Sequence, residues 1–365
     1  MRILVLANTP AHVHLYRHAV SRLEQRGHDV LVLGREYGCT IDLLEFYGLA
    51  YRSYGSHSAP DSRVAFGRQL AGQFGEIART AITFRPDVVF GRGPYAAFAG
   101  NLARATTVLV LDDEPADINH TVSRPFAECI LSPAVTRRDL GNSHYTFDGF
   151  VQCAYLHPEV FEPTADIHQY LGLDADDPYA IVRFNALDAL HDAGLEGFSL
   201  AQRRQLIERL AEEVTVFVSD EGDDLEFADL PARPYDLHPA LMHDAMAGAR
   251  LLVADTGTMV TEAGLLGTPA LRFRGSDDHV YGEFRELERV GLVEQFDEYD
   301  RLCERALELA VDETATDRWR QTRETYVDGL VDLTEIIVEV AESGGSIDRL
   351  ESSTRRSLKQ RSMPG

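Results

Sequence analysis

The segment Asp255–Pro269 has the residue types and the spacing that could hold a nucleotide. A short apolar run ends at Ala254 and predicts a buried parallel strand, and the residues after it predict a turn and then a helix over Met259–Leu266. The free amides at the start of such a helix, with the helix dipole behind them, would accept a phosphate or pyrophosphate. A glutamate one turn into the helix could take both hydroxyls of a ribose. The residues of this segment that we expect to contact the nucleotide are Thr256, Gly257, Thr258, Met259 and Glu262.

This segment also has a plain structural interpretation. Glycine turns before helices are common in doubly wound sheets, so the segment could be an ordinary strand–helix–strand connection in which Glu262 is solvated. Both interpretations stay open on the local pattern alone. The elements around the segment must therefore decide between them.

Arg183 is near the end of another predicted strand, Tyr179–Phe184, and its side chain could bind the same ligand. A guanidinium can hold a diphosphate through two parallel hydrogen bonds and can neutralise the charge that grows on a departing nucleotide. His191 and Asp192 lie in the loop that follows and could position Arg183 or touch an acceptor. A structural clasp within this loop is the alternative role for that pair.

His12 and His14 come soon after the first predicted strand, Arg2–Ala7, in an expected strand-to-helix loop that leads into a helix over 14–26. Because histidine titrates near neutral pH, either residue could act as a general base toward an acceptor hydroxyl. Alternatively, one of them caps the helix and the other packs against a linker. His14 and His18 have the i, i+4 spacing of metal ligands, but no third ligand lies nearby in the sequence, so we expect no metal.

Three consecutive carboxylates, Asp112, Asp113 and Glu114, follow the predicted strand Thr107–Leu111. The carboxyl end of a buried strand is where a catalytic carboxylate is expected, and Asp113 and Glu114 are the preferred pair for activating an acceptor. The alternative is that they are surface carboxylates, which are frequent in a chain this acidic. The first half of the chain therefore offers two sets of candidate bases.

Strands and helices alternate along both halves of the chain, which predicts two parallel sheets with helices on both faces. Prolines in the extended stretch 150–165 predict a linker between an N-terminal domain, 1–160, and a second domain, 161–341. Residues 342–365 are rich in Ser, Gly and Arg and are expected to form a disordered tail. Two doubly wound domains of this kind would place their loops face to face across a cleft, where ligands bind.

The formal net charge of −24 and the presence of one lysine, Lys359, among 35 basic residues are typical of halophilic proteins, whose salt-rich cytoplasm screens the self-repulsion. No concentrated basic face is recognisable, so nucleic acid is not an expected partner. The four scattered cysteines predict free thiols in a reducing compartment, and no apolar run is long enough to cross a bilayer. We therefore expect a cytoplasmic protein, whose basic tail leaves peripheral membrane contact open.

The segment Asp255–Pro269 resembles the donor-nucleotide element of the GT-B superfamily, which includes nucleotide-sugar glycosyltransferases and the non-hydrolysing UDP-N-acetylglucosamine 2-epimerases. Three further segments are similar to epimerase segments in the same order: Phe84–Phe90, Ala116–Thr121 and Ile130–Pro133. The resemblance implies that the glycine turn meets a diphosphate and that Glu262 holds the ribose. It also implies that His238 lies near the base of the nucleotide.

A closer likeness covers almost the whole chain up to its helical end. The chain resembles a GT-B-like family of archaea and bacteria whose function is unassigned. The segments that carry this likeness are Asn8–His14, Arg26–Val30, Tyr155–Pro158, Arg183–Gly194 and Asp255–Pro269. The resemblance implies an α/β fold with two Rossmann-like doubly wound domains and a nucleotide-sugar ligand, and it implies no particular reaction.

The chain departs from the epimerase pattern at two catalytic positions. Epimerases place an aspartate in a His-Gly-Asp turn after the strand that corresponds to Val88–Phe90, where this chain has Arg92-Gly93-Pro94. Their catalytic histidine follows a strand of the second domain, and the matching loop 219–224 contains no histidine. Because moving a proton off and back onto a sugar carbon needs groups of matched pKa on both sides of the ring, these departures argue against epimerisation.

These observations favour a metal-independent glycosyltransferase of glycan or glycoconjugate biosynthesis that needs no cofactor. A nucleotide sugar, with a UDP-sugar as the first choice, would bind the second domain, and a glycan or lipid-linked acceptor would bind the first. Two other functions stay open: an isomerase or hydrolase of UDP-N-acetylhexosamine, and a non-catalytic protein that binds nucleotide sugars.

Overall fold

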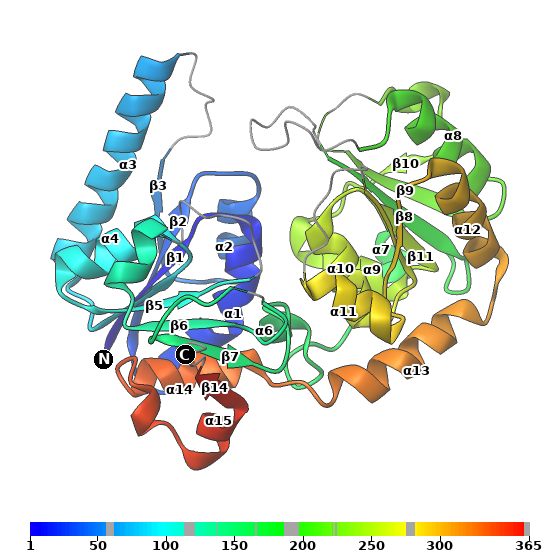
Figure 1. Cartoon of the computed structure of the whole chain (residues 1–365). Coiled ribbons are helices and arrows are strands. Elements are labelled where there is room, and N and C mark those ends of the chain that lie inside the picture. The colour runs from blue at the N-terminus through cyan, green and yellow to red at the C-terminus, as the bar shows by residue number, and fades with distance from the viewer. Residues whose placement is uncertain are drawn as a thin grey trace. The chain divides into compact units, whose positions relative to one another are not determined.

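The computed structural model of the chain divides into two compact units (Figure 1). The first unit consists of Met1–Val160 together with Leu330–Gly365, and the second unit is Phe161–Gly329. The structure describes residues 1–55, 62–112, 121–136, 138–164, 166–185, 197–220, 222, 225–274 and 282–360. Four of the predicted site residues lie outside these ranges: Asp113, Glu114, His191 and Asp192.

The first unit is built on a sheet of eight strands within its described residues: β1 (Arg2–Ala7), β2 (Asp29–Arg35), β3 (Tyr51–Tyr54), β4 (Val88–Gly91), β5 (Thr106–Val110), β6 (Cys129–Pro133), β7 (His144–Phe147) and β14 (Leu358–Gln360). Their spatial order is β14-β7-β6-β5-β4-β1-β2-β3. All neighbouring strands are parallel except β14 and β7. The central strands β1, β4 and β5 are buried along nearly their whole length, as expected for a parallel sheet that helices cover on both faces.

The helices of the first unit form two groups on this sheet. One group consists of α1 (Pro10–Gln25), α2 (Thr40–Phe46), α6 (Cys153–Leu156) and α14 (Leu333–Glu342), and the other consists of α3 (Arg63–Phe84), α4 (Pro94–Ala103) and the 3-10 turn η1 (Arg124–Phe126). The strand order reverses between β1 and β4. Right-handed crossovers therefore place the two groups on opposite faces of the sheet (Figure 1).

Helix α1 begins at Pro10, earlier than the sequence analysis predicted. Proline favours the first helical turn because its fixed φ suits a helix and because the N–H that it lacks would have no partner there. The helix ends at Gln25, before Gly27, whose φ is +84°. His12 and His14 therefore lie inside the first turns of α1 rather than in a loop, which corrects the predicted position of both residues.

The second unit contains a sheet of six strands within its described residues: β8 (Tyr179–Phe184), β9 (Thr215–Asp220), β10 (Arg233–Pro234), β11 (Leu251–Ala254), β12 (Ala270–Phe273) and β13 (Glu294–Phe296). All neighbouring strands are parallel, in the order β10-β9-β8-β11-β12-β13. This is the doubly wound order of a Rossmann sheet, which reverses between its first and fourth strands, β8 and β11.

The helices of the second unit are α7 (Ile167–Tyr170), α8 (Leu200–Leu210), α9 (Met242–Gly248), α10 (Gly257–Leu266), α11 (Gly282–Val290), α12 (Tyr299–Val311) and α13 (Ala315–Val327), with the 3-10 turns η2 (Phe227–Asp229) and η3 (Pro239–Leu241). Helices α7, α9, α10 and α13 pack together, and α8 packs on α12. A capping box formed by Ser199 and Gln202 starts α8, so the first amides of that helix are satisfied.

Helix α14 returns the chain to the first unit, where ion pairs join it to α1. The carboxylate of Asp332 caps the helix by accepting hydrogen bonds from the amides of Thr334 and Glu335. Arg22 of α1 then pairs with Asp332 at 3.1 Å and with Glu335 at 2.9 Å. The structure thus assigns α14 to the first unit, whereas the sequence analysis placed these residues in the second domain.

The described residues after α14 are ordered elements, and this differs from the tail that we predicted from residue 342. They form η4 (Ile347–Arg349), α15 (Ser352–Ser357) and β14, which pairs antiparallel with β7. Thr354 Oγ1 donates a 2.6 Å hydrogen bond to Glu339 of α14, and Leu358 is buried. A few apolar residues thus anchor a stretch whose average composition is polar, which is why composition alone suggested disorder.

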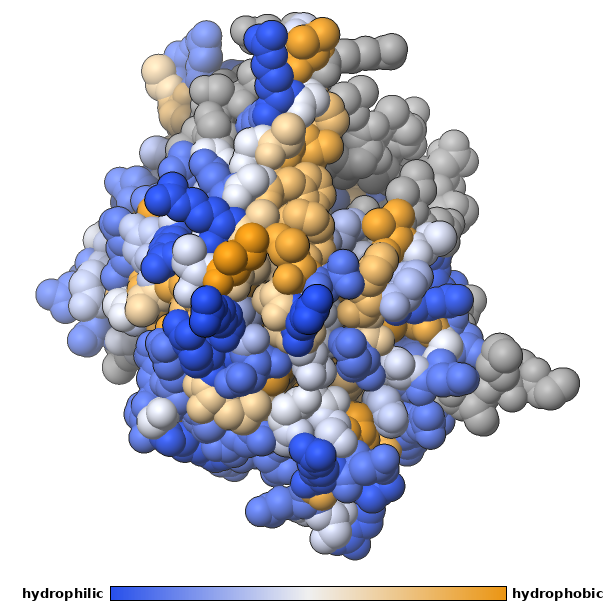
Figure 2. All heavy atoms as spheres, turned by 90° about the vertical axis from the view of Figure 1, so that its left-hand side faces the viewer, coloured by the Kyte–Doolittle hydropathy of each residue, from blue (hydrophilic) through white to orange (hydrophobic). Residues whose placement is uncertain are grey.

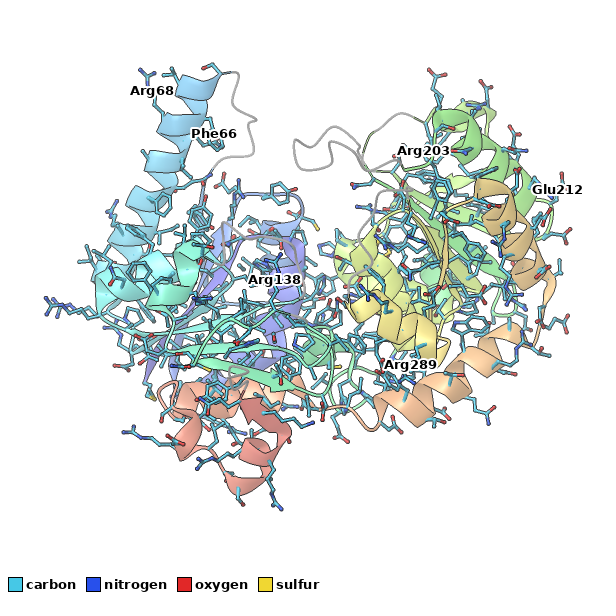
Figure 3. All side chains as sticks on the ribbon, viewed as in Figure 1. Phe66, Arg68, Arg138, Arg203, Glu212 and Arg289 are labelled. Carbon is cyan, nitrogen blue, oxygen red and sulfur yellow. The ribbon has the colours of Figure 1, made fainter. Side chains whose placement is uncertain are left out.

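The face of the first unit that carries α3 and α4 has exposed apolar side chains. Figure 2 shows hydrophobic residues gathered in a band between hydrophilic ones on this face. Val64 and Phe66, near the start of α3, are 67% and 55% exposed, and Phe66 and Arg68 are labelled at that end of the helix in Figure 3. In the part of the chain that the structure describes, no helix has both the length and the apolar character needed to cross a membrane.

We expect removal of residues 346–365 to destabilise the first unit. The deletion exposes the edge of β7 and the apolar surfaces that Ile347, Leu350 and Leu358 cover, and each such side chain contributes about 2 kcal/mol when fully buried. The melting temperature, followed by circular dichroism in molar KCl, should fall by several degrees. The control is Lys359→Ala, which removes an exposed ion pair with Asp148 and should change stability by less than about 1 kcal/mol. An unchanged melting temperature for the deletion would contradict this role.

Candidate functional site

Both sheets reverse their strand order at one point, and doubly wound sheets bind ligands outside the carboxyl ends of the strands at that point. The reversal lies between β1 and β4 in the first unit and between β8 and β11 in the second. The residues directly after these four strands are Asn8, Arg92, Asn185 and Asp255. All four take part in polar networks within their own unit.

Arg183 places a positive charge at the reversal point of the second sheet. It is the next-to-last residue of β8 and lies opposite Ala254 of β11 in the parallel register. Its Nη1 donates a hydrogen bond to Oγ of Ser219 on β9, so a neighbouring strand orients the guanidinium. The side chain is partly buried, and it is therefore a fixed cation beside the chain that leads from β11 into α10.

Helix α10 begins at Gly257, two residues earlier than predicted, and Thr256 is its N-cap residue. The predicted turn is therefore shorter, and Thr258 and Met259 belong to the first turn of the helix. The first amides of a helix have no partner within the helix, and the dipole of this ten-residue helix favours an anion at that end. Thr258 is exposed and its neighbours in this turn are partly exposed, so this end of the helix is not fully buried.

Phe284 of α11 covers one side of this N-terminus. A Cβ added to Gly257 would lie 2.8 Å from the Phe284 ring, so glycine is needed here because of close packing. The guanidinium of Arg272 on β12 lies 4.1 Å from the centroid of the same ring, which is a cation–π distance. The position of α10 against α11 thus explains the glycine without reference to a ligand.

Glu262 is buried in the second turn of α10, contrary to the interpretation in which it is solvated. It is 5% exposed, and its Oε1 lies 3.2 Å from Nε2 of His243 on α9. His243 is 2% exposed, and the ring of Phe161 covers it with an edge contact at 6.2 Å. The structure therefore gives Glu262 a partner that the sequence analysis did not anticipate, and its contact with a ribose stays a prediction.

Arg203 of α8, labelled in Figure 3, binds the backbone on both sides of the segment 186–196. Its Nη2 donates to the carbonyl oxygen of Asn185 at 3.0 Å, and its Nε donates to that of Phe198 at 3.1 Å. Its Nη1 lies 3.3 Å from Oδ1 of Asp220 at the end of β9. Because Arg203 is 3% exposed, one buried guanidinium ties the ends of β8 and β9 to the start of α8.

Asp255 binds the same two backbone positions through their amides. The N–H of Asn185 donates to Asp255 Oδ1 at 2.9 Å, and the N–H of Phe198 also stabilises this carboxylate. Burial raises the pKa of Asp255, and the two amides and the charge of Arg203 partly offset that effect. Asn185 and Phe198 are therefore each held by both their amide and their carbonyl group.

His238 precedes α9 and caps the short turn η3. Its Nδ1 accepts a hydrogen bond from the N–H of Ala240 at 3.1 Å, so the neutral ring carries its proton on Nε2. The structure thus explains the position of His238 by a capping bond. Its contact with the base of a nucleotide stays a prediction.

His12 lies in the first turn of α1 and reaches back to the end of β1. The backbone N–H of Asn8 donates to His12 Nδ1 at 3.1 Å, and the side-chain oxygen of Asn8 accepts a 2.6 Å hydrogen bond from the hydroxyl of Tyr54 on β3. Because a backbone amide can only donate, His12 Nδ1 is an acceptor, and the neutral ring carries its proton on Nε2.

The positive charge of Arg92 acts on the His12 ring. Burial lowers the pKa of His12 well below its usual value, and the positive charge of Arg92 lowers it further. Arg92 follows β4 and forms an ion pair with Asp112, which follows β5. His12 is therefore held neutral with its Nδ1 lone pair occupied, which argues against the general-base role that the sequence suggested.

His14 packs inside the helix group around α1. Its ring centroid lies 5.9 Å from that of Tyr47 and 5.5 Å from that of Tyr155, in the predicted linker. His14 thus packs against the predicted linker, as in the alternative that the sequence left open. The N-cap residue of α1, Thr9, has no side-chain cap, and His12 binds the amide of Asn8, one residue before it. Nε2 of His18 accepts a hydrogen bond from Arg17, and burial lowers the His18 pKa to about 4. Among the described residues, no group of three or more His, Cys, Asp or Glu side chains could hold a metal ion.

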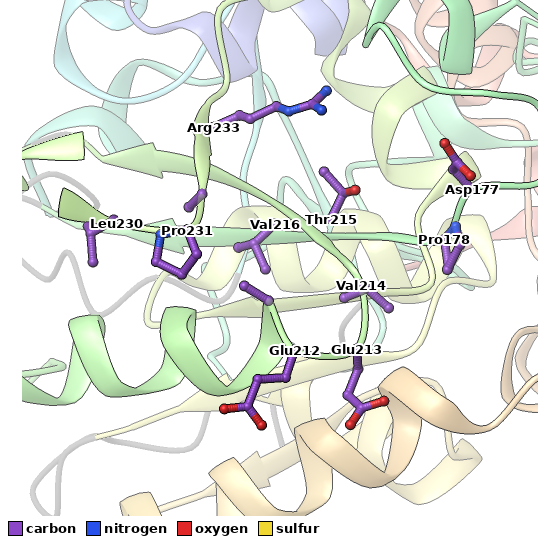
Figure 4. Close-up of a pocket in the computed structure, with 12 residues that line it drawn as sticks. Asp177, Pro178, Glu212, Glu213, Val214, Thr215, Val216, Leu230, Pro231 and Arg233 are labelled. Carbon is purple, nitrogen blue, oxygen red and sulfur yellow. The ribbon is translucent and has the colours of Figure 1, made fainter. Parts of the chain in front are cut away.

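A depression of about 620 Å³ lies at the amino ends of the strands of the second sheet, opposite the ends that carry Arg183 and α10 (Figure 4). It is lined by residues at the amino ends of β8, β9 and β10, among them Asp177, Glu213, Thr215 and Arg233. None of the candidate site residues lines it. Because doubly wound sheets bind ligands at the carboxyl ends of their strands, we place the candidate site at Arg183 and α10 and not in this depression.

Sequence reasoning missed three residues of these networks: Tyr54, Arg203 and His243. One signal could have found Arg203, because it falls on the apolar stripe of α8 with Leu206 and Leu210, where a charged side chain indicates a buried partner. Tyr54 and His243 had no comparable signal, since their partners lie far from them along the chain or on another helix.

Comparison with known proteins gives one family and one uncharacterized relative. The family described as "Protein of unknown function (DUF354)" has a model that matches residues 2–342. An uncharacterized protein of Methanocaldococcus jannaschii is 22% identical over 283 residues, which cover 73% of this chain and 79% of that protein.

Solved structures with similar folds include epimerases and glycosyltransferases. The UDP-GlcNAc 2-epimerase from Methanocaldococcus jannaschii has a TM-score of 0.64 and 15% identity, and the match covers 94% of this chain and all of the other. The UDP-GlcNAc 2-epimerase from Neisseria meningitidis bound to UDP-GlcNAc has a TM-score of 0.65 and 13% identity, and the match covers 94% of this chain and 100% of the other. The spinosyn forosaminyltransferase SpnP has a TM-score of 0.65 and 14% identity, and the match covers 95% of this chain and 100% of the other. At these identities the likeness shows the fold, and it confirms the predicted GT-B type with two Rossmann-like parallel sheets.

We expect Arg203→Met to destabilise the second unit by about 3–5 kcal/mol, because it leaves Asp220 and two carbonyl groups without their buried cation. Arg203→Lys keeps the charge, but an ammonium group cannot reach both carbonyl oxygens and Asp220 at once. We therefore expect a loss of stability smaller than that of Arg203→Met. The measurement is urea unfolding followed by the fluorescence of the single tryptophan, Trp319 on α13. Arg204→Lys, on the same helix but partly exposed, is the control and should stay within about 0.5 kcal/mol. Equal stability of Arg203→Met and the wild type would rule out the bridging role.

Proposed function

The chain belongs to the DUF354 family, and from that premise we propose that its second unit binds a nucleotide sugar and that the protein transfers the sugar to an acceptor. The related folds include proteins that act on UDP-GlcNAc and a forosaminyltransferase. A UDP-sugar is the first choice of donor. The acceptor, a glycan or a lipid-linked saccharide in this proposal, would bind the first unit.

One observation carries the proposal: a fixed cation and a helix N-terminus occur together at the reversal point of the second sheet. Arg183 is in register with Ala254, three residues before Gly257 opens α10. A diphosphate at this edge could accept hydrogen bonds from the amides of α10 and charge-assisted bonds from the guanidinium. This pairing supports a diphosphate ligand better than either feature would alone.

In the proposed reaction, an acceptor oxygen bonds to the anomeric carbon while the bond from that carbon to the diphosphate breaks. The nucleoside diphosphate leaves with the bonding electron pair, and Arg183 and the α10 amides stabilise its growing charge. The proton of the acceptor hydroxyl passes to a general base. We assign the base to Asp113 or Glu114, which the sequence favoured, because the Nδ1 lone pair of His12 is occupied.

The direct test is incubation with UDP- and GDP-sugars in molar KCl, with and without glycan and lipid-phosphate acceptors. We expect free nucleoside diphosphate to appear only when a suitable acceptor is present. A changed sugar without acceptor would instead favour an isomerase, and acceptor-independent release would favour a hydrolase. Measurable binding with no turnover under any condition would favour the non-catalytic alternative, and the absence of nucleotide binding would reject the proposal.

We expect Arg183→Ala to weaken UDP binding by about tenfold to a hundredfold, the range for losing hydrogen bonds to a charged group. Arg183→Lys should lose less, because the charge remains while the paired donor geometry is lost. Isothermal titration calorimetry in molar KCl would measure both. The matched control is Arg233→Ala, an exposed arginine on β10 at the opposite edge of the same sheet, which should leave the affinity within about twofold. Equal losses for Arg183→Ala and Arg233→Ala would show a general charge effect instead of a site.

A further inference from the structure

The reversal point of the first sheet carries a histidine whose protonation state is set by the backbone. We propose that His12 is a fixed, neutral hydrogen-bond donor that presents Nε2–H to an oxygen of the bound acceptor, and that it is not the general base. The identity of the ligand rests on the proposed function. The state of the ring does not, because it follows from contacts inside the first unit.

The contact with Asn8 determines which ring nitrogen can donate. The backbone amide of Asn8 points its hydrogen at His12 Nδ1, and that nitrogen can accept it only as a bare lone pair. The hydroxyl of Tyr54 holds the side chain of the same asparagine. Reversing the tautomer would set two N–H groups against each other, so the proton stays on Nε2.

Nε2 is also the ring nitrogen that can meet a ligand. His12 is 9% exposed, and the bond from the Asn8 amide is the hydrogen bond that its ring makes within the described part of the chain. With Nδ1 engaged by Asn8, Nε2–H is the hydrogen-bond donor that the ring has left for a ligand. His12 lies in the helix that follows β1, at the point where the first sheet reverses its strand order, which is where doubly wound sheets bind ligands.

The charged and titratable groups around His12 keep the ring neutral. Arg92, from the end of β4, acts on it with a positive charge, and this arginine is paired with Asp112 from the end of β5. Tyr16, one turn further along α1, is buried beside the same arginine, and burial raises its pKa. Tyr54 is buried too, and burial likewise raises its pKa, so it remains a donor to Asn8. The single carboxylate in this set is engaged by Arg92.

A neutral donor has a different use from a base. A hydrogen bond donated to the attacking oxygen would make that oxygen a weaker nucleophile, so the oxygen that His12 holds is a non-reacting hydroxyl or carbonyl oxygen of the acceptor. His12 then determines how the acceptor is positioned and recognised. Its loss should raise the KM for the acceptor more than it lowers kcat, and it should leave nucleotide binding in the second unit unchanged.

The state of the ring is tested by ¹⁵N NMR on protein labelled at histidine, with His12→Gln to assign the signal. We expect the neutral Nε2–H tautomer at neutral pH, with a pKa well below the ordinary histidine value of about 6.5, because burial and Arg92 disfavour the charged ring. A proton on Nδ1, or an imidazolium at neutral pH, would overturn the proposal. This measurement needs neither substrate nor activity.

The role in binding is tested with two variants that differ only in what the side chain can do. His12→Gln can still accept from the Asn8 amide through its side-chain oxygen, and it can still donate through its side-chain nitrogen. His12→Glu can accept but cannot donate. We expect His12→Gln to keep the acceptor KM within about tenfold of wild type and His12→Glu to raise it about a hundredfold, because the acceptor oxygen loses its donor and faces a carboxylate. A base would give the reverse order, in which His12→Glu is active and His12→Gln is not, and that result would reject the donor role.

The two proposals fail in different ways. If the wild-type protein neither binds nor turns over nucleotide sugars, the proposed function is wrong, and the NMR measurement still decides the state of His12. If transfer occurs but both variants match the wild type in acceptor KM, the proposed function stands and the donor role is rejected. Circular dichroism of both variants checks that the first unit remains folded.

Discussion

At the carboxyl end of each parallel strand the chain leaves the sheet, and the next amide and carbonyl groups need new partners. This chain supplies those partners from side chains of the following helix or of the neighbouring strand end. His12 of α1 accepts from the amide after β1, whereas Arg203 of α8 and Asp255 after β11 hold the groups after β8. The bonds that complete the backbone at these ends also fix the side chains at the point where each sheet reverses. The interactions that complete the fold at these strand ends are therefore the same ones that position the side chains of the candidate site.

The carboxylates near both reversal points are largely engaged inside the protein. Asp112 pairs with Arg92, Asp220 with Arg203, and Glu262 lies against His243. Removing one member of such a buried pair leaves an uncompensated charge, so these carboxylates first serve the fold. The groups at the described strand ends that suit a ligand are donors: the Arg183 guanidinium, the amides of α10 and the Nε2–H of His12. A ligand rich in oxygen lone pairs fits such a set.

Local patterns in the sequence predicted much of the fold, because buried parallel strands are short apolar runs and helix ends carry proline and glycine. They also pointed to Arg183 and the start of α10 as candidate binding groups, where the chemistry of one residue and of its neighbours in sequence is enough to make the prediction. They failed where partners are distant in the chain, as for Tyr54 with Asn8, Arg203 with Asp220 and Glu262 with His243. The ordered residues after α14 were missed for a related reason, since Leu358, which is buried, pairs with Phe147 of β7, far away in the chain.

The acidity of the chain and an anionic ligand are compatible because the two electrostatic effects act over different distances. Repulsion of a nucleotide by a formal charge of −24 is summed over many exposed carboxylates and is long-ranged. Salt reduces the screening length from about 8 Å at physiological ionic strength to about 3 Å at 1 M. Hydrogen bonds from Arg183 and from helix amides act below that distance, and partly buried groups are screened less. High salt therefore removes most of the repulsion and leaves the local attraction. A few fixed donors at a strand reversal would thus suffice for the anionic ligand that we propose, even on a chain this acidic.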